Sequence, residues 1–284
     1  PAFFQPGIQF TAKKILQYSI ILLGFGMNLF EILAVGSQSL LIIVSTIGTA
    51  LITAYILSRI MNIERDIATL VGVGSSICGG SAIAAAAPVI KASDKDIAQS
   101  ISVIFLFNVV AAFLFPALGD MLGFTDTGFG MWAGTAINDT SSVVAAGQTW
   151  ASAHGSDTAL NYATIVKLTR TLAIIPICLG LAYITSKTKN TAADVKITSI
   201  FPMFILYFVM AAIFNPLAGE SLPVLAQLPA IGKFMIAMAM AAIGLNTNLV
   251  SLVKSGGKPI LLGLVCWIFI ALVSIGMQHV LGIW

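Results

Sequence analysis

The run Gly74-Ser75-Ser76-Ile77-Cys78-Gly79-Gly80-Ser81-Ala82-Ile83-Ala84-Ala85-Ala86 lies inside a long apolar stretch over residues 67–90. A second run, Gly134-Thr135-Ala136-Ile137-Asn138-Asp139-Thr140-Ser141-Ser142-Val143-Val144-Ala145-Ala146, lies inside the stretch 128–150. Both centres are too polar and too rich in glycine for helices that face lipid along their whole length. Irregular backbone survives at membrane depth only where protein buries it or water reaches it. The two stretches are therefore predicted to be interrupted elements inside a membrane domain.

The composition of the whole chain agrees with this interpretation. Of 284 residues, 58% are apolar and 9% are charged, with a net charge of +3. Soluble domains are about 45–50% apolar and about 25% charged, so a soluble, disordered or nucleic-acid-binding protein is excluded. Three cysteines lie in apolar stretches without a second thiol or histidine at ligand spacing, which predicts neither a disulfide framework nor a metal site. No cofactor is expected apart from a coupling ion, Na⁺ or H⁺. The fold class is predicted to be an all-α, polytopic membrane protein.

Nine segments have the length and apolar character of membrane spans, which need about 20 mostly apolar residues each. Only short polar linkers separate them, so a single transmembrane domain over 1–284 is expected. The chain begins with Pro1, and we expect one or more N-terminal helices to precede it. The segments are 15–35, 40–62, 67–90, 97–119, 128–150, 160–184, 199–218, 230–252 and 259–283.

Two internal repeats are visible. An offset of 60 residues superposes the two glycine-rich runs without a gap and places Pro116 on Pro176. An offset of 220 residues pairs 15–62 with 230–283 and places Gly24, Asn28 and Leu29 on Gly244, Asn248 and Leu249. The alternative for the second offset is similar helix-end chemistry, since glycine often ends helices.

The topology is predicted from counting crossings and from charge. If 67–90 and 128–150 are re-entrant hairpins, both repeats become inverted, as in many transporters. One side of the membrane then holds eleven of the lysines and arginines and the other holds Lys233, so the first side is predicted to be cytoplasmic. The two hairpin tips, near Gly79-Gly80 and near Asn138-Asp139-Thr140, would meet at the membrane midplane.

Interrupted elements that meet at the midplane can form a binding site from backbone groups. Helix N-termini attract anions, and freed carbonyls at helix C-termini suit Na⁺ or H⁺. Nearby hydroxyl and amide groups add hydrogen-bonding capacity, whereas tight packing by small residues is the structural alternative. The predicted substrate-binding residues in the two runs are Ser75, Ser76, Gly79, Gly80, Ser81, Asn138, Thr140, Ser141 and Ser142.

Four further polar residues lie deep in apolar segments. A carboxylate such as Asp139 costs about 2.5–3.5 kcal/mol at a helix centre on insertion scales, which predicts a proton carrier or the partner of a cation. Helix N-capping is the alternative role. Lys167 and Arg170 are three residues apart on one helical face, and one of them is expected to pair with Asp139. Arg170 is predicted to bind substrate, while Asp139, Lys167 and Asn108 are the ion-coupling candidates. A structural ion pair is the alternative for the two cations.

The run Gly-Ser-Ser-Ile-Cys-Gly-Gly-Ser-Ala-Ile-Ala-Ala at 74–85 resembles the signature of a bacterial inner-membrane family. This is the YeiH-like family, usually labelled as sulfate exporters. The run at 133–147 resembles its second signature, and Gly-Leu-Asn-Thr-Asn-Leu at 244–249 with Ser-Gly-Gly-Lys-Pro at 255–259 resembles its C-terminal pattern. The resemblance implies the cation–proton antiporter and bile-acid symporter superfamily. It further implies a panel domain, a moving core, two interrupted crossing helices, a homodimer and a multi-pass location in the bacterial inner (plasma) membrane.

The expected function is secondary active transport of a small anion by an elevator mechanism, coupled to H⁺ or Na⁺. Sulfate, an organosulfur acid and another organic acid are the candidate substrates, and the direction of transport stays open. The alternative is an anion channel or a membrane sensor on the same fold. We expect no enzymatic activity, because the sequence lacks a histidine-rich metal set, a Gly-x-Ser-x-Gly elbow and a Walker A run.

Overall fold

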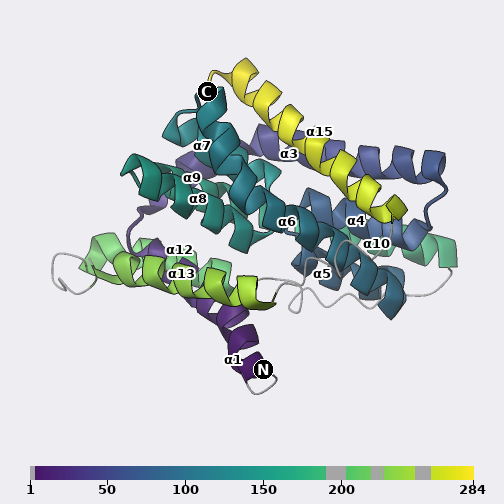
Figure 1. Ribbon diagram of the computed structural model, residues 1–284, viewed down its shortest axis with the longest axis horizontal. Helices are drawn as coiled ribbons and strands as arrows, with labels where there is room; N and C mark the ends of the chain where they lie inside the picture. Colours follow the sequence, from purple (N-terminus) through teal and green to yellow (C-terminus); the bar gives the residue numbers. More distant parts are fainter. Residues whose placement is uncertain (1–3, 190–202, 219–224, 226, 247–256) are drawn as a thin grey trace. The chain divides into compact units, whose positions relative to one another are not determined.

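The computed structural model describes residues 4–189, 203–218, 225, 227–246 and 257–284. Within these residues the regular secondary structure is helical and no β-strand occurs, which confirms the all-α fold class (Figure 1). Four helical stretches in this part of the chain are long and apolar enough to cross a membrane. They are Leu29–Met61, Asp94–Leu122, Thr158–Lys187 and Gly257–Leu281.

The described residues fall into two compact units. The first unit takes residues from 1–38 and 202–248, and the second takes residues from 39–201 and 249–284. The first contains α1 (Gln5–Phe10), the π-helical turn η2 (Thr11–Ile15), α2 (Leu16–Gly24), α12 (Met203–Ala218) and α13 (Leu228–Asn246). The second contains both glycine-rich runs.

Small residues allow close helix packing in the first unit. A Cβ atom added at Gly24 would lie 2.6 Å from the carbonyl oxygen of Phe208 on α12. One added at Gly232 on α13 would lie 3.0 Å from the carbonyl oxygen of Ser19 on α2. The first distance is too short for any side chain and the second is tight, so the glycines let α2 approach its two neighbours closely.

The predicted segments 15–35 and 40–62 have the wrong boundaries. Helix α2 ends at Gly24, and a continuous helix of 33 residues, α3, runs from Leu29 to Met61. The side chain of Asn28 caps the N-terminus of α3. Its oxygen accepts hydrogen bonds from the main-chain N–H groups of Phe30 at 2.7 Å and Glu31 at 3.3 Å. The polar residues near position 37 do not break α3, because the Ser37 hydroxyl donates back to the carbonyl of Ala34 at 2.9 Å.

The first glycine-rich run forms a helical hairpin, called here the first hairpin. It consists of α4 (Arg65–Ser76) and α5 (Gly80–Ile90). Arg65 at the start of α4 and Ile90 at the end of α5 line the same small cavity, so the two outer ends lie together. Nearer the tip, a Cβ atom at Gly74 would lie 2.9 Å from the Ile83 side chain, and α5 therefore folds back along α4.

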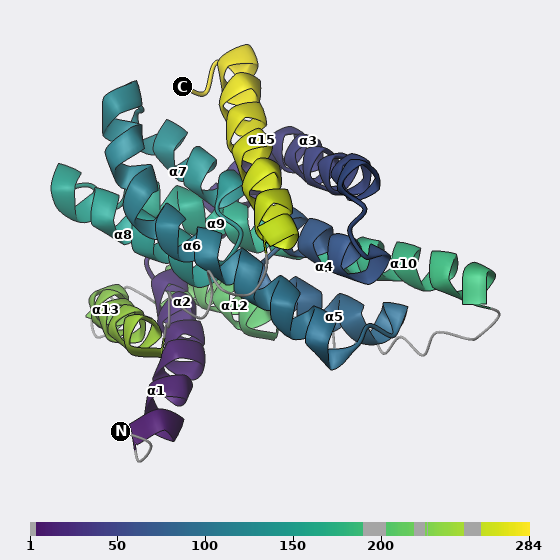
Figure 2. The ribbon, with the colours of Figure 1, turned by 45° about the vertical axis from the view of Figure 1, so that its right-hand side comes forward.

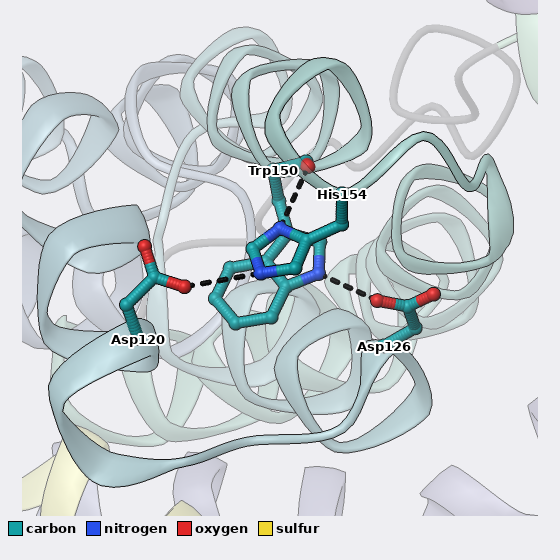
Figure 3. Close-up of polar contacts among 4 residues, drawn as sticks. All are labelled: Asp120, Asp126, Trp150 and His154. Atoms are coloured by element: carbon teal, nitrogen blue, oxygen red, sulfur yellow. Dashed lines mark hydrogen bonds and ion pairs between the residues drawn. The ribbon is translucent and has the colours of Figure 1, made fainter.

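The second run forms a matching element, the second hairpin, from α7 (Asp126–Ala136) and α8 (Thr140–His154). The indole N–H of Trp150 near the end of α8 donates to the Asp126 carboxylate at the start of α7, at 2.8 Å (Figure 3). His154 stacks on Trp150 with ring centroids 4.1 Å apart, and its Nε2 lies 3.1 Å from the Asp120 carboxylate. The outer ends of the second hairpin are thereby joined to each other and to the end of the preceding helix.

Helix α6 (Asp94–Leu122) connects the two hairpins and places them at its opposite ends. It begins just after α5 and ends just before α7, and both ribbon views show it between the two hairpins (Figure 1 and Figure 2). Its 29 residues span roughly 43 Å at 1.5 Å per residue. The residue at its middle is Asn108. The hairpin tips therefore point toward each other and meet beside the centre of α6.

The helix boundaries repeat at the offset seen in the sequence. Helices α4 and α7 end at Ser76 and Ala136, and helices α5 and α8 begin at Gly80 and Thr140. Each pair of positions differs by 60. The chain then returns through α9 (Thr158–Thr171) and α10 (Ile174–Lys189), and α15 (Gly257–Leu281) packs against α4, α6 and α7. Two positions of the longer repeat, Asn248 and Leu249, lie outside the described residues.

Candidate functional site

The two hairpin tips contact each other at the breaks between their helices, Ile77–Gly79 and Ile137–Asp139. We call the site formed by these six residues together with Asn108, Lys167 and Arg170 the crossing. Gly79 has a φ of +69°, a conformation that glycine adopts without strain. A Cβ atom there would lie 3.4 Å from both the Asp139 Cβ and the Asn108 Nδ2. Gly79 and Asp139, which are equivalent positions of the 60-residue repeat, therefore face each other directly.

Asn108 holds the second tip against the centre of α6. Its side-chain oxygen accepts hydrogen bonds from the main-chain N–H of Asn138 at 3.1 Å and from that of Asp139 at 2.9 Å. These two N–H groups lie in the break between α7 and α8, where no helical carbonyl is available to them. Asn108 is 2% exposed, so the contact is shielded from competing water.

Lys167 joins the two breaks to each other. From α9, its Nζ donates to the carbonyl oxygen of Ile77 in the first hairpin at 2.7 Å and to that of Ile137 in the second at 3.1 Å. The residue is 0% exposed. A buried ammonium group is costly unless it is fully hydrogen-bonded, and these carbonyls supply acceptors at a place where both helices end.

Arg170, one turn further along α9, binds the end of the first hairpin's first helix. Its Nε donates to the carbonyl of Ser76 at 2.8 Å and one terminal nitrogen donates to that of Ser75 at 2.7 Å. The other terminal nitrogen lies 3.5 Å from the carbonyl of Ile137. Arg170 is also 0% exposed. Its planar fork suits adjacent carbonyls, which a lysine would contact only as a point charge.

The expected ion pair with Asp139 is not among these contacts. Among the described residues, no ion pair joins Asp139 to Lys167 or to Arg170. Both cations instead satisfy carbonyls at the C-terminal ends of α4 and α7, where the helix dipole is negative. The substrate-binding role of Arg170 and the coupling role of Lys167 stay predictions.

The N-terminal ends of α5 and α8 form the other half of the crossing. Asp139 is the N-cap of α8: its carboxylate accepts a hydrogen bond from the main-chain N–H of Ser141 at 2.9 Å and another from the Ser141 hydroxyl. Gly79 is the N-cap of α5 and has no side chain to offer, so the first N–H groups of α5 lack a side-chain cap. Gly80, Ser81, Asp139 and Thr140 are each at least partly exposed.

Several buried polar atoms at the crossing and on the neighbouring Ser75 lack a hydrogen-bond partner among the described residues. These are both side-chain heteroatoms of Asn138, the Nδ2 of Asn108 and the hydroxyl of Ser75. Asn138 is 1% exposed. An unpartnered buried polar group costs about 1–3 kcal/mol, so a polar ligand that reached these atoms would gain hydrogen bonds.

Some of the site residues predicted from sequence meet at the crossing, and the side chains of others do not contribute to it. Gly79, Asn108, Asn138, Asp139, Lys167 and Arg170 come together at the crossing, and Ser75 and Ser76 contribute their carbonyls there. The hydroxyl of Ser76 is turned away and donates to Val73 at 3.0 Å. Ser81 is exposed on the first turn of α5, and Ser142 is buried on α8.

The two residues that accept hydrogen bonds from Lys167 were not predicted from the sequence. Ile77 and Ile137 supply the carbonyls that Lys167 binds, but their side chains are apolar and carry no functional signal. Their equivalence at the 60-residue offset was the available clue, because it placed both at the point where the repeat switches from one helix to the next.

The comparisons with known proteins agree on one family. The family model described as conserved hypothetical protein 698 matches residues 1–263. A UPF0324 membrane protein of Streptococcus mutans is 57% identical over 288 residues, covering 99% of this chain and 84% of that protein. The UPF0324 membrane protein FN0533 of Fusobacterium nucleatum is 55% identical over 295 residues, covering 99% of this chain and 85% of that protein.

A third relative, the UPF0324 membrane protein SAG1125 of Streptococcus agalactiae, is 53% identical over 284 residues and covers 99% of this chain and 84% of its own length. No solved structure is significantly similar to this chain. The apolar helices and the names of these relatives agree that the protein resides in a membrane. The chain therefore belongs to the family of conserved hypothetical protein 698, the UPF0324 membrane proteins, which is the family that the paired glycine-rich signatures indicated.

Proposed function

We propose that this protein is a secondary active transporter of a small anion, with its substrate site at the crossing. The observation that carries the proposal is the division of charge there. Lys167 and Arg170 neutralise the carbonyl ends of α4 and α7, which leaves the N-terminal ends of α5 and α8 as the accessible side. Helix N-termini present free N–H groups and partial positive charge, the combination that binds anions.

Formal charge favours the same class of substrate. Two buried cations and the single carboxylate of Asp139 leave one net positive charge at the crossing. An anion that reaches Gly80, Ser81 and Thr140 would compensate this charge. The unpartnered amide of Asn138 and the uncapped N-terminus of α5 supply hydrogen bonds for its oxygens. Sulfate and small organic or organosulfur acids have the required charge and acceptors.

The contacts favour H⁺ over Na⁺ as the coupling ion. Freed carbonyls at helix ends are the usual ligands for Na⁺ in interrupted helices. Here Lys167 and Arg170 already bind the carbonyls of residues 75, 76, 77 and 137. Asp139 is partly exposed and stands at the same crossing, so protonation of its carboxylate can change the local charge as the substrate binds.

The division into two units supports an elevator mechanism. Both hairpins belong to the second unit, whereas α2 and α13 belong to the first. The opposed hairpins and the 60-residue offset of their boundaries support an inverted repeat, the arrangement on which alternating access is commonly built. Re-entrance into the membrane, a homodimeric assembly and a bacterial inner-membrane location stay predictions.

Counterflow in proteoliposomes tests the proposal. Vesicles that contain the full-length protein are loaded with unlabelled sulfate and diluted into labelled sulfate, and the assay is repeated with small organic and organosulfur acids. A carrier accumulates label transiently and in a saturable way for at least one of these anions. Conductance without saturation or counterflow favours the anion channel. Saturable binding without flux favours a sensor, and turnover of a substrate without transport would indicate an enzyme.

A further inference from the structure

A large cavity lies between α3, α4 and α10 of the second unit, and none of the crossing residues lines it. Its volume is about 860 Å³, near the upper end of the range of about 300–1,000 Å³ for ligand sites in proteins. Figure 1 and Figure 2 both show these three helices running to the same side of the second unit.

The chemistry of the lining changes from one end of the cavity to the other. Arg59 in the last turn of α3 and Arg65 at the start of α4 form a cationic end. Leu51 lies eight residues before Arg59 on α3, and Val73 lies eight residues after Arg65 on α4, so the apolar lining extends about 12 Å from the arginines. Ile177 supplies an apolar wall from α10.

The cationic end is not neutralised from within the cavity. Its lining residues, all of them described, include two arginines and no aspartate or glutamate. Both arginines are exposed, and the Arg59 guanidinium lies 5.5 Å from the centre of the Tyr55 ring. Lys258 adds a third cation close by, because its Nζ donates to the carbonyl of Met61 at 3.0 Å. Asp66 lines a small adjoining cavity that shares Arg65.

We propose that this cavity binds one anionic phospholipid, with an acyl chain along the apolar wall and the headgroup phosphate between Arg59 and Arg65. A water-soluble anion would leave the apolar part of the cavity uncovered, whereas a purely apolar occupant would leave two arginines without a counter-charge. Basic pockets between transmembrane helices bind anionic headgroups in this way.

Glycines in open space provide variants that alter the cavity without disturbing packing. Gly180 on α10 lines the cavity, and a Cβ atom there would meet no atom within 4 Å. Gly180→Leu is therefore expected to fill the space for the acyl chain while the helix stays intact. Gly276 on α15 is equally exposed and equally open but lies outside the lining, so Gly276→Leu is its matched control.

The experiment measures lipid binding to the intact, full-length protein by native mass spectrometry. The probes are phosphatidylglycerol, phosphatidylcholine with the same acyl chains, and free glycerol 3-phosphate. We expect retention of one phosphatidylglycerol. Each arginine replaced by glutamine should weaken its binding roughly fivefold, since a basic group near an anionic lipid contributes about 1 kcal/mol. Gly180→Leu should abolish retention, and Gly276→Leu should leave it unchanged.

A double variant, Lys13→Gln with Lys14→Gln, removes two exposed cations that do not line the cavity. Its phosphatidylglycerol binding should match that of the unaltered protein. The proposal would be overturned if phosphatidylcholine or free glycerol 3-phosphate bound as strongly as phosphatidylglycerol. It would also be overturned if the Lys13/Lys14 double variant lost as much phosphatidylglycerol binding as a double variant with both Arg59 and Arg65 replaced by glutamine. Unchanged binding in Gly180→Leu would overturn it as well, because the lipid would then occupy another surface. Thermal melting of every variant verifies that it is folded.

Discussion

The side-chain oxygen of Asn108 accepts a hydrogen bond from the main-chain N–H of Asp139 at 2.9 Å. This contact joins the middle of α6, the helix that connects the two hairpins, to the tip of the second hairpin. It fixes the N-cap of α8 beside Gly79, the N-cap of α5. The position of the second tip therefore depends on a side-chain amide oxygen, which accepts from two main-chain N–H groups in the break between α7 and α8.

Replacing Asn108 by alanine should destabilise the protein. The main-chain N–H groups of Asn138 and Asp139 would lose their acceptor, and each buried group left unpaired costs about 1–3 kcal/mol. Thermal melting in detergent should show a clear decrease in Tm. Asn161→Ala, at a half-buried position of α9 away from these bonds, should change Tm far less, and equal shifts in the two variants would contradict the assignment.

Arg170→Ala should be more damaging than Arg170→Lys. The alanine variant leaves the carbonyls of Ser75 and Ser76 without a donor, and two unpaired buried acceptors together cost about 2–6 kcal/mol. Lysine keeps the charge but loses the planar fork. The Tm of Arg170→Lys should therefore lie between that of the unaltered protein and that of Arg170→Ala. The control is Lys187→Ala, at an exposed position of α10. If the lysine variant were no more stable than the alanine variant, the charge at the helix ends would not be the stabilising feature.

Asp139→Asn should separate capping from coupling. Asparagine caps helices about as well as aspartate, so α8 should still begin at Thr140 and Tm should change little. The charge that is proposed to bind H⁺ is lost, and transport driven by a pH gradient should be abolished or become independent of pH. Asp139→Ala is the matched comparison, since it also removes the cap at a cost of about 1 kcal/mol. Transport with an unaltered pH profile in Asp139→Asn would exclude Asp139 as the proton carrier.

The outer end of the second hairpin should show a pH-dependent stability. Asp126 precedes the buried part of the hairpin. The hydrogen bond from the Trp150 indole lowers the pKa of the Asp126 carboxyl group below the ordinary value of 3.8. A carboxyl group whose pKa is lower in the folded than in the unfolded state stabilises the protein at pH values above its unfolded-state pKa. This contribution is lost as the pH falls through the folded-state pKa. Trp150→Phe should therefore lower Tm at pH 7, and the difference from the unaltered protein should shrink below about pH 4.

A double-mutant cycle with Asp126→Asn isolates the contribution of that hydrogen bond. In the Asp126→Asn background, the Tm difference caused by Trp150→Phe should not depend on pH in the acid range. A pH-dependent difference that persists in this background would show that the hydrogen bond between Trp150 and Asp126 is not its cause.

Accessibility of single cysteines tests the topology of the hairpins. Lys91→Cys at the end of α5 and Lys187→Cys near the end of α10 should react with an impermeant maleimide from the cytoplasmic side. Ala153→Cys at the end of α8 is exposed as well and should react from the opposite side. The native cysteines Cys78, Cys178 and Cys266 are buried, so the unaltered protein is the control for background labelling. Labelling of Lys91→Cys and Ala153→Cys from one side would refute the opposed re-entrant hairpins.

The sequence by itself determined the class of protein and the places where its two central elements break. Composition indicates membrane helices because a bilayer admits only long apolar segments. The glycine-rich runs predicted tips near residues 79–80 and 138–140, and the structure breaks the helices at 77–79 and 137–139. The prediction was possible because helix ends depend on local residues such as the N-cap Asp139 and Gly79 with its positive φ. The boundary between α2 and α3 was missed, since the cap formed by Asn28 lies between two equally apolar stretches.

Only the tertiary structure decided what the buried cations do. Lys167 and Arg170 bind carbonyls of residues up to 95 positions away in the sequence. Every residue carries a main-chain carbonyl, so no pattern of side chains marks the ones that become acceptors. The cavity beside Arg59 and Arg65 has the same origin, because α10 becomes its third wall only when the chain folds back against α3 and α4.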